Sequence, residues 1–203
     1  MPRPKNTDER REQIIDGLLK VMSHQGYEGA TVHDIARAAK LSPGLVHYHF
    51  GTKREVLEGL MARLLEGHFA ALDAAMAEAG ASALARLDAF IDQHLATGAT
   101  ANPHALSAWV VLGAEAVTSK VVRARYAEGL AGLHERLVAV IADGQRRGEL
   151  KGPPPDEAAA GILAAVEGFY VVAATARPLI PRGAAAPTLR AMARGMFEPK
   201  RRS

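Results

Sequence analysis

Residues 31–54, TVHDIARAAKLSPGLVHYHFGTKR, constrain the fold of this 203-residue chain more than any other segment. Thr31 can cap a short helix that carries apolar residues on one side. A break at Lys40 ends that helix, and Ser42 followed by Pro43 opens a second one. Two short helices joined by a turn of three or four residues form a helix-turn-helix, which places its second helix in the major groove of DNA. The segment therefore predicts DNA binding.

The positive charge of the chain is concentrated around this segment. Residues 1–54 hold nine Lys and Arg against six Asp and Glu, whereas residues 55–203 hold sixteen of each sign. Four of the eight histidines also fall within residues 1–54. The net charge of +3 therefore belongs to the part that contains the predicted helix-turn-helix, and this favours a polyanion such as DNA as the partner.

The residue patterns of common enzymes and metal sites are missing from the sequence. The chain has no cysteine, so it offers no disulfide, thiolate ligand or cysteine nucleophile. It also has no H-E-x-x-H motif, no G-x-S-x-G elbow and no glycine-rich phosphate loop. We therefore expect no catalytic site, no metal and no cofactor.

The sequence gives no sign of secretion or of a membrane anchor. Its start, MPRPKNTDERREQ, is charged and does not resemble a signal peptide. We find no apolar run that approaches the roughly 18 residues that a membrane span needs. We therefore expect a soluble, cytoplasmic protein without a membrane partner.

Helical patterns extend along the rest of the chain, where strand signals are nearly absent and aromatic residues make up only 5%. Besides the two short helices, we expect one over about residues 8–25, ended by Gly26, and a long one after the capping box that Thr52 forms with Glu55. Further helices are expected at about 82–97, 104–117, 119–147, 156–176 and 187–197. The fold class is therefore all-α.

The N-terminal motif resembles the tetracycline-repressor (TetR) family over about residues 8–65. The residues that carry the resemblance are Thr31, Val32, Ile35, Ala36, Ser42, Pro43, Gly44, Tyr48, Phe50, Gly51 and Lys53. The chain departs from the family pattern at Lys40, where the family often has glycine. A residue other than glycine in a left-handed turn costs on the order of 1 kcal/mol, which a packed unit tolerates.

The C-terminal two thirds resemble the family more loosely. Trp109, the pair Arg125-Tyr126 and the run from Leu137 to Leu150 are similar to the effector domain of its choline-responsive, BetI-like branch. The resemblance implies a DNA-binding domain over residues 1–54 and a helical ligand-binding and dimerisation domain over residues 55–203.

The second short helix is expected to provide the contacts with the bases. Leu45, Val46 and Phe50 can face inward, and the other residues are left outward. Small residues at its start allow a close approach of the backbone to the groove, and His47 is placed for a base edge. The expected DNA-binding residues are Thr31, Arg37, Lys40, Ser42, Pro43, Gly44, His47, Tyr48, His49 and Lys53.

Several of these residues are expected to hold phosphates rather than bases. The resemblance implies phosphate contacts for Tyr48 and His49. Thr31 and Lys53 each stand at a helix start, where backbone N–H groups and the helix dipole add to their side chains. Two alternatives stay open at this stage: Tyr48 as a packing residue, and the two histidines as half of a metal site.

Contacts with an effector are expected from residues with a large ring or a polar tip in the second domain. These are Phe90, His94, Trp109, Glu115, Tyr126, Phe169 and Tyr170. Trp109 and Tyr126 can form part of an aromatic cage for a cation, with Glu115 opposite. For each of the seven, a purely structural role remains open.

Segments 156–176 and 187–197 are assigned to a homodimer interface. The first is apolar on nearly every side, and its Gly161, Gly168 and many alanines allow close approach of a symmetry mate. The alternative is a helix buried within one chain.

Together these features predict a homodimeric transcriptional regulator, most simply a repressor, that binds a pseudo-palindromic double-stranded operator and is released by an unknown small-molecule effector. Two other functions remain open. The chain could be a DNA-binding regulator without such an effector, either constitutive or controlled by a protein, or it could be a helical adaptor.

Overall fold

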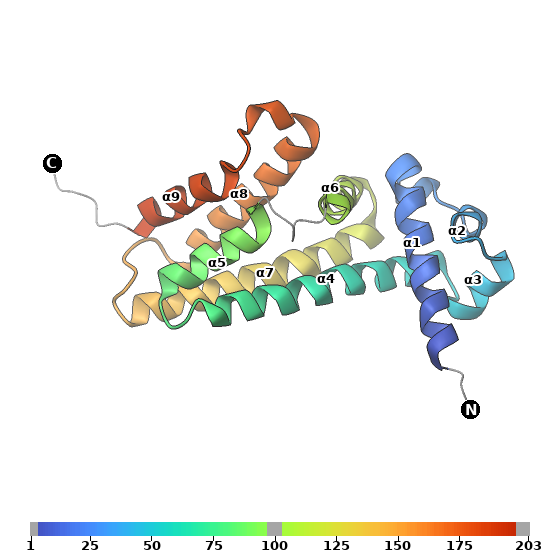
Figure 1. Cartoon of the computed structure of the whole chain (residues 1–203), viewed down its shortest axis with the longest axis horizontal. Helices are drawn as coiled ribbons and strands as arrows, with labels where there is room; N and C mark the ends of the chain where they lie inside the picture. The colour runs from blue at the N-terminus through green and yellow to red at the C-terminus, as the bar shows by residue number, and fades with distance from the viewer. Residues whose placement is uncertain (1–3, 97–102, 198–203) are drawn as a thin grey trace. The chain divides into compact units, whose positions relative to one another are not determined.

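The computed structural model describes residues 4–96 and 103–197, which form nine α-helices, one short 3-10 helix and no strand (Figure 1). The expected all-α class is confirmed. In chain order the helices are α1 (Pro4–Gly29), α2 (Val32–Ala38), α3 (Pro43–His49), α4 (Lys53–Glu78), α5 (Ala83–Leu95), α6 (Pro103–Thr118), α7 (Lys120–Arg146), α8 (Pro155–Thr175), η1 (Arg177–Leu179) and α9 (Ala185–Phe197).

Side-chain caps start the two short helices where the sequence predicts them. The Asp34 backbone N–H donates to the Thr31 hydroxyl at 3.1 Å, and the Asp34 carboxylate accepts from the Thr31 backbone N–H at 3.3 Å. The Ser42 hydroxyl accepts from the Leu45 N–H at 3.3 Å, with Pro43 as the first residue of α3. Each cap satisfies N–H groups that a helix leaves without a partner.

The long helix α4 begins with a similar arrangement. The Glu55 N–H donates to the Thr52 hydroxyl at 3.2 Å, as expected for a capping box. The Glu55 carboxylate reaches back to the N–H of Gly51 at 3.0 Å rather than to that of Thr52. The predicted start of the long helix is confirmed at Lys53.

The first helix is longer than the sequence predicts, because it begins at Pro4 and its last turn reaches Gly29. Gly26 still interrupts it, with φ of 70° and ψ of 174°, a conformation that only glycine adopts without strain. The segment after Gly26 therefore leaves the axis of α1 and leads into the cap of α2.

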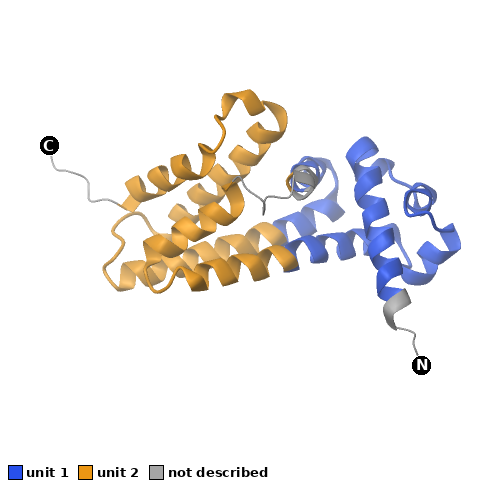
Figure 2. Ribbon diagram, in the orientation of Figure 1, with its two compact units in different colours: residues 1–66, 107–128 blue, residues 67–106, 129–203 orange. Residues whose placement is uncertain are grey.

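The chain divides into two compact units (Figure 2). Unit 1 comprises residues 1–66 and 107–128, and unit 2 comprises residues 67–106 and 129–203. The core of unit 1 includes Ile14, Leu18, Ile35, Val46, Phe50, Leu57, Leu60, Leu112 and Val122. The core of unit 2 includes Leu72, Leu87, Phe90, Ile91, Leu137, Val140, Ile141, Ile162, Val166, Leu189 and Phe197.

These units differ from the domains expected at residues 1–54 and 55–203. The first part of α4 and the residues 107–128 of α6 and α7 pack with the N-terminal helices. Packing units and functional domains need not coincide, so the functional boundary after residue 54 stays a prediction.

Helix α8 buries only one side within the chain. Ala158, Ala159, Ile162, Leu163 and Val166 lie in the core of unit 2. Beyond the first turn, where Asp156 and Glu157 are exposed, the exposed residues include a helical stripe of small and apolar residues at Ala160, Ala164, Gly168 and Val171. The alternative of a helix fully buried within one chain does not hold for this structure.

The composition of α8 also corrects an expectation about membranes. Pro155–Thr175 has the length and the mean hydropathy, 1.7, of a helix able to cross a membrane, so one segment does reach that threshold. In the structure 28% of the most apolar 18-residue stretch of this helix is buried. A helix that packs only one side into a core and carries small and apolar residues on the other side meets the same test.

Candidate nucleic-acid interface

The helix α3 buries little and exposes a varied polar surface. Of its seven residues only Val46 is buried. His47 and Gly44 are exposed, and Tyr48 is 78% exposed, which excludes a core role for its ring. Leu45 was expected to face inward but is 40% exposed. The outward side of α3 is therefore available for a groove.

The C-terminal end of α3 is held by Arg11 of α1. The Arg11 guanidinium donates from Nη1 to the His49 carbonyl oxygen at 2.6 Å and lies 4.0 Å from the centroid of the Phe50 ring. Phe50 is buried in the core of unit 1. Arg11 thus satisfies a carbonyl group at the end of α3 and fixes the position of that end against α1. No local signal points to Arg11, because its partner is 38 residues away in sequence.

The turn between α2 and α3 has the backbone that the sequence predicts. Lys40 has φ of 57°, in the left-handed region. Its N–H donates to the Arg37 carbonyl at 3.1 Å, and the Leu41 N–H donates to the Ala36 carbonyl at 2.9 Å, which closes the end of α2. The exposed Lys40 therefore stands at a tightly fixed corner of the motif.

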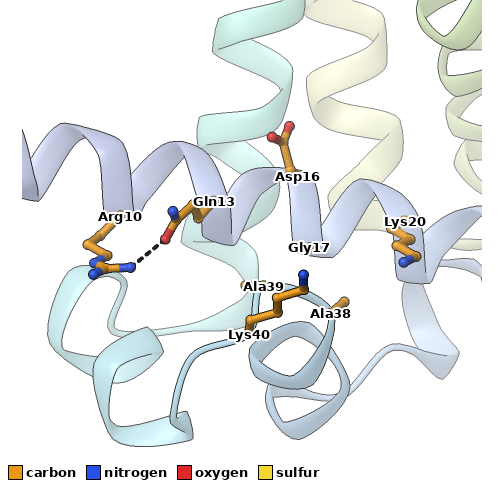
Figure 3. A pocket seen from close by; sticks show the side chains of 8 residues that line it. All are labelled: Arg10, Gln13, Asp16, Gly17, Lys20, Ala38, Ala39 and Lys40. Carbon is orange, nitrogen blue, oxygen red and sulfur yellow. Dashed lines mark hydrogen bonds between the residues drawn. The ribbon is translucent and has the colours of Figure 1, made fainter.

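A depression of about 330 Å³ lies between α1 and this turn (Figure 3). Its lining consists of Arg10, Gln13, Asp16, Gly17, Lys20, Ala38, Ala39 and Lys40. Asp16 forms an ion pair with Arg63 at 2.9 Å and projects away from Lys40 in Figure 3. The lining charges near the turn are therefore positive. Arg10 and Lys20 extend the positive surface beyond the residues that the motif indicates.

Gly17 allows α1 to pack closely against α2 beside this depression. A Cβ atom at Gly17 would lie 2.7 Å from the Ile35 carbonyl oxygen and 3.1 Å from the Ala39 Cβ. Any larger residue would therefore push α1 away from α2. The contact fixes the first two helices at short range and so supports the orientation of the turn.

The other predicted phosphate contacts differ in how free they are. Arg37 is exposed and paired with Asp34 on the surface, and such a pair exchanges easily with solvent or phosphate. The Thr31 hydroxyl is engaged in its capping box. His49 is half-buried and exposed His47 stands beside Tyr48. Among the described residues no group of three or more potential ligands gathers around the histidines.

Lys53 is turned toward the protein. Its Nζ donates to the carbonyl oxygens of Tyr27 at 2.9 Å, Ala30 at 3.0 Å and Glu28 at 3.4 Å. It also lies 4.4 Å from the centroid of the buried Tyr27 ring. These contacts do not test the expected role of Lys53 as a phosphate ligand. They show that its ammonium group has partners within the protein.

The seven expected effector residues fall into two groups, one in each unit. In unit 1 the rings of Trp109 and Tyr126 contact each other, with centroids 4.5 Å apart and planes tilted by 33°. The carboxylate of Glu115 accepts a hydrogen bond from the Glu28 N–H at 3.1 Å. Glu115 therefore contacts the last turn of α1, and a cage for a cation stays a prediction.

In unit 2 three expected residues meet around a buried histidine. His94 stacks on Phe90 with centroids 4.3 Å apart. The Tyr170 hydroxyl donates to the His94 carbonyl oxygen at 3.1 Å. Phe169 packs against the core of unit 2. His68, which the sequence did not single out, places its Nε2 2.9 Å from the Nε2 of His94.

The hydrogen bonds of this cluster are satisfied by two neutral imidazoles. The Nδ1 of His94 lies 2.7 Å from the Phe90 carbonyl oxygen, so Nδ1 carries the proton and Nε2 accepts from His68. Burial lowers the pKa of His94 to about 3, and the neighbouring His68 adds to this shift. Burial also lowers the pKa of His68 and raises that of Tyr170. The cluster is a buried, uncharged polar group.

Comparison with known proteins places these features in a family. Residues 14–60 match the family model described as bacterial regulatory proteins, tetR family, and residues 83–198 match the one described as BetI-type transcriptional repressor, C-terminal. An HTH-type transcriptional regulator BetI from Rhizobium meliloti (strain 1021) is 31% identical over 183 residues, which cover 84% of this chain and 81% of that protein.

Solved structures agree in fold. A putative transcriptional regulator from Saccharomonospora viridis in complex with choline has a TM-score of 0.71 at 24% identity, covering 95% of this chain and all of that one. The regulator FadR from Bacillus subtilis in complex with stearoyl-CoA has a TM-score of 0.75 at 21% identity, covering 92% of this chain and 97% of that one.

Proposed function

The chain belongs to the TetR family of DNA-binding transcriptional regulators, with a BetI-type C-terminal region, and we propose that it is a homodimeric repressor released from its operator by a small molecule. The observation that carries this proposal is the outward side of α3. There His47 and Tyr48 are exposed on a helix whose two ends are fixed by Ser42 and Arg11. A rigid helix with an exposed polar side suits the major groove.

The residues of this surface divide into two roles. His47, with Ser42, Pro43 and Gly44 at the start of α3, faces the base edges. Tyr48, His49, Arg37 and Lys40 contact phosphates, and the N-terminus of α2 at Thr31 adds its backbone N–H groups. Phosphate contacts set affinity and register, whereas contacts with base edges set the choice of sequence.

A second copy of the chain completes the DNA-binding surface. Small and apolar residues are exposed in one chain on two helices of unit 2. They are the stripe from Ala160 to Val171 on α8 and Met192 on α9. A two-fold dimer through these helices buries them and presents two α3 helices to a pseudo-palindromic operator. A regulator of this kind acts on the chromosome, so we also assign it to the cytoplasm.

The effector lowers DNA binding because it prefers one of two conformations of the protein. A small molecule that binds better to the conformation with misplaced α3 helices lowers operator affinity by that difference in affinity. The two solved relatives were crystallised with choline and with stearoyl-CoA, which are chemically unlike. They support a small molecule as the effector class without selecting one.

The seven candidate residues give two distinct places for this molecule. In unit 1 a quaternary ammonium would separate the contacting rings of Trp109 and Tyr126 and use their faces, with Glu115 supplying negative charge. In unit 2 a molecule with a polar group would open the cluster of Phe90, His94 and Tyr170, with Phe169 as a further wall.

Operator binding in the presence of candidate effectors tests the function. Fluorescence anisotropy of a labelled promoter fragment should give tight binding by the dimer and release by one compound among choline, related ammonium ions and acyl-CoA thioesters. Binding that no compound changes would favour a constitutive or protein-controlled regulator. Absence of DNA binding would leave the helical adaptor.

The single tryptophan reports where the effector binds. Trp109 is the only tryptophan in the chain, so a ligand that separates it from Tyr126 should change its fluorescence. A Phe169→Ala variant serves as the matched probe for unit 2. An effector in unit 2 should lose affinity in that variant while the Trp109 signal stays small.

A further inference from the structure

The segment that joins α1 to α2 is held by a charged side chain from α4. After Gly26 the chain turns away from the axis of α1, so the carbonyl groups that follow are not part of one continuous helix. The carbonyl oxygens of Tyr27 and Glu28, in the last turn of α1, and of Ala30, just after it, converge on the Nζ of Lys53 at 2.9, 3.4 and 3.0 Å. The Tyr27 carbonyl also accepts from the Ala30 N–H at 3.1 Å. A carbonyl oxygen is an acceptor, and an ammonium group is a donor only.

These contacts use the whole hydrogen-bonding capacity of the side chain. A lysine ammonium has three N–H donors, and the three carbonyl groups account for all of them. The face of the Tyr27 ring covers the same ammonium at 4.4 Å, and Tyr27 itself is only 4% exposed. Lys53 is half-buried as a result. To reach a phosphate, the ammonium would have to leave four favourable contacts.

The position of Lys53 in the chain gives these contacts a consequence for α3. Lys53 follows the end of α3 by four residues and is the first residue of α4. Ala30, one of its acceptors, directly precedes Thr31, the cap of α2. The side chain therefore ties the residue before the cap of α2 to the start of α4, which follows α3 after a three-residue connection, and so sets the two helices of the motif against α1.

We propose that Lys53 is a positioning residue: its ammonium holds the α1–α2 junction through main-chain carbonyls and so orients α3, and it neutralises no DNA phosphate. The effect on DNA rests on the proposed operator binding by α3.

The dependence of operator affinity on salt separates the two roles. Each phosphate neutralised by a cation contributes about 0.9 to the slope of log K against log salt concentration. The Lys53→Met variant keeps the aliphatic stem and removes the donors. It should lower operator affinity at every salt concentration with the wild-type slope, and it should lower the thermal unfolding midpoint by about 5 °C.

Three further variants serve as references. Lys40→Asn removes an exposed cation at a positive φ that asparagine tolerates, and it should reduce the slope by about 0.9 with little change in the midpoint. Lys120→Met removes an exposed cation at the start of α7 and should change neither quantity. Lys53→Gln keeps two N–H donors without charge and should recover part of both losses.

Several results would overturn the proposal. A slope reduced by about 0.9 in Lys53→Met would identify a phosphate ligand. A wild-type unfolding midpoint in that variant would remove the structural role, and a Gln variant no better than Met would show that charge, not hydrogen bonding, matters. A wild-type chain that binds no DNA would refute the proposed function, while the midpoints would still test the carbonyl contacts.

Discussion

Helices α3 and α8 each bury one side and expose the other, yet the exposed sides differ in kind. On α3 the exposed residues include His47 and Tyr48, which carry hydrogen-bonding groups. On α8 the exposed stripe from Ala160 to Val171 consists of small and apolar residues. Exposed polar groups on a fixed helix suit a hydrated, charged partner, whereas an exposed apolar stripe is stable only when another protein surface covers it.

The two helices also differ in what holds them. Seven-residue α3 buries one side chain and depends on contacts at its ends, from the Ser42 hydroxyl and from Arg11. The 21 residues of α8 have no side-chain cap but bury five side chains and hydrogen-bond to α5 through Tyr170. A short helix gains stability from its ends and a long one from its buried side. Four predictions test this contrast.

The largest effect is expected at the apolar stripe of α8. Val171 is 49% exposed in one chain, and the Val171→Glu variant would place one carboxylate per chain in the dimer interface. Because an unpaired buried charge costs several kcal/mol, the dissociation constant of the dimer should rise about hundredfold, so that monomers appear at higher protein concentrations. Sedimentation velocity measures this. Gln93→Glu adds the same charge at an exposed residue of α5 and should leave the dimer intact; a dimeric Val171→Glu chain would refute the interface.

The next effect concerns the buried side of α8, where Tyr170 contacts His94. The pKa of His94 falls from 6.5 to about 3 on folding, so between these values the unfolded chain binds a proton that the folded chain excludes. Stability is therefore retained above pH 6.5 and lost as the pH falls, by about 2 kcal/mol between pH 7 and pH 5. Urea unfolding at the two pH values measures the loss.

Two substitutions check that this loss comes from the buried pair. The His94→Gln variant should show a flatter pH dependence, because glutamine retains hydrogen bonding without titrating. His24→Gln, at an exposed histidine of α1, should keep the wild-type dependence. Equal slopes for all three proteins would exclude the buried imidazoles as the cause.

A smaller effect is expected on the exposed side of α3. Tyr48→Ala should weaken operator binding about tenfold on every sequence, because we propose that its exposed hydroxyl contacts a phosphate. His47→Ala should instead change which operators are preferred, since a base-edge contact discriminates by about 1–3 kcal/mol. Binding to a library of operator variants distinguishes the two. If His47→Ala keeps the wild-type preferences, base reading lies at Ser42 or Gly44.

The smallest effect tests how the ends of the helices contribute. Removing the hydroxyl in Ser42→Ala should lower the free energy of unfolding by about 1 kcal/mol, because the Leu45 N–H loses one of its two acceptors and keeps only the Ser42 carbonyl oxygen. Pro154→Ala, before the uncapped start of α8, should change it by less. Chemical denaturation measures both. Equal losses would mean that end contacts do not distinguish the two helices.

Much of the fold could be predicted because its signals are local. Thr31, Ser42 and Thr52 cap helices through residues three positions away, and Lys40 takes the left-handed backbone expected at a turn. The helices after Gly80 lie within about two residues of the predicted ranges. The extension of α1 to Pro4 and the exposure of Leu45 escaped prediction, because neither is set by a short pattern.

The sequence alone therefore determined the helix-turn-helix, the all-α class and the family, since caps, helical periodicity and motif spacing all act over a few residues. Only the tertiary structure decided which polar and charged side chains already have hydrogen-bond partners within the protein. Lys53 reaches carbonyls 23 to 26 residues away, Glu115 an N–H 87 residues away, and His68 pairs with His94 across 26 residues. Such contacts depend on how helices pack, and packing brings together residues that no local pattern relates.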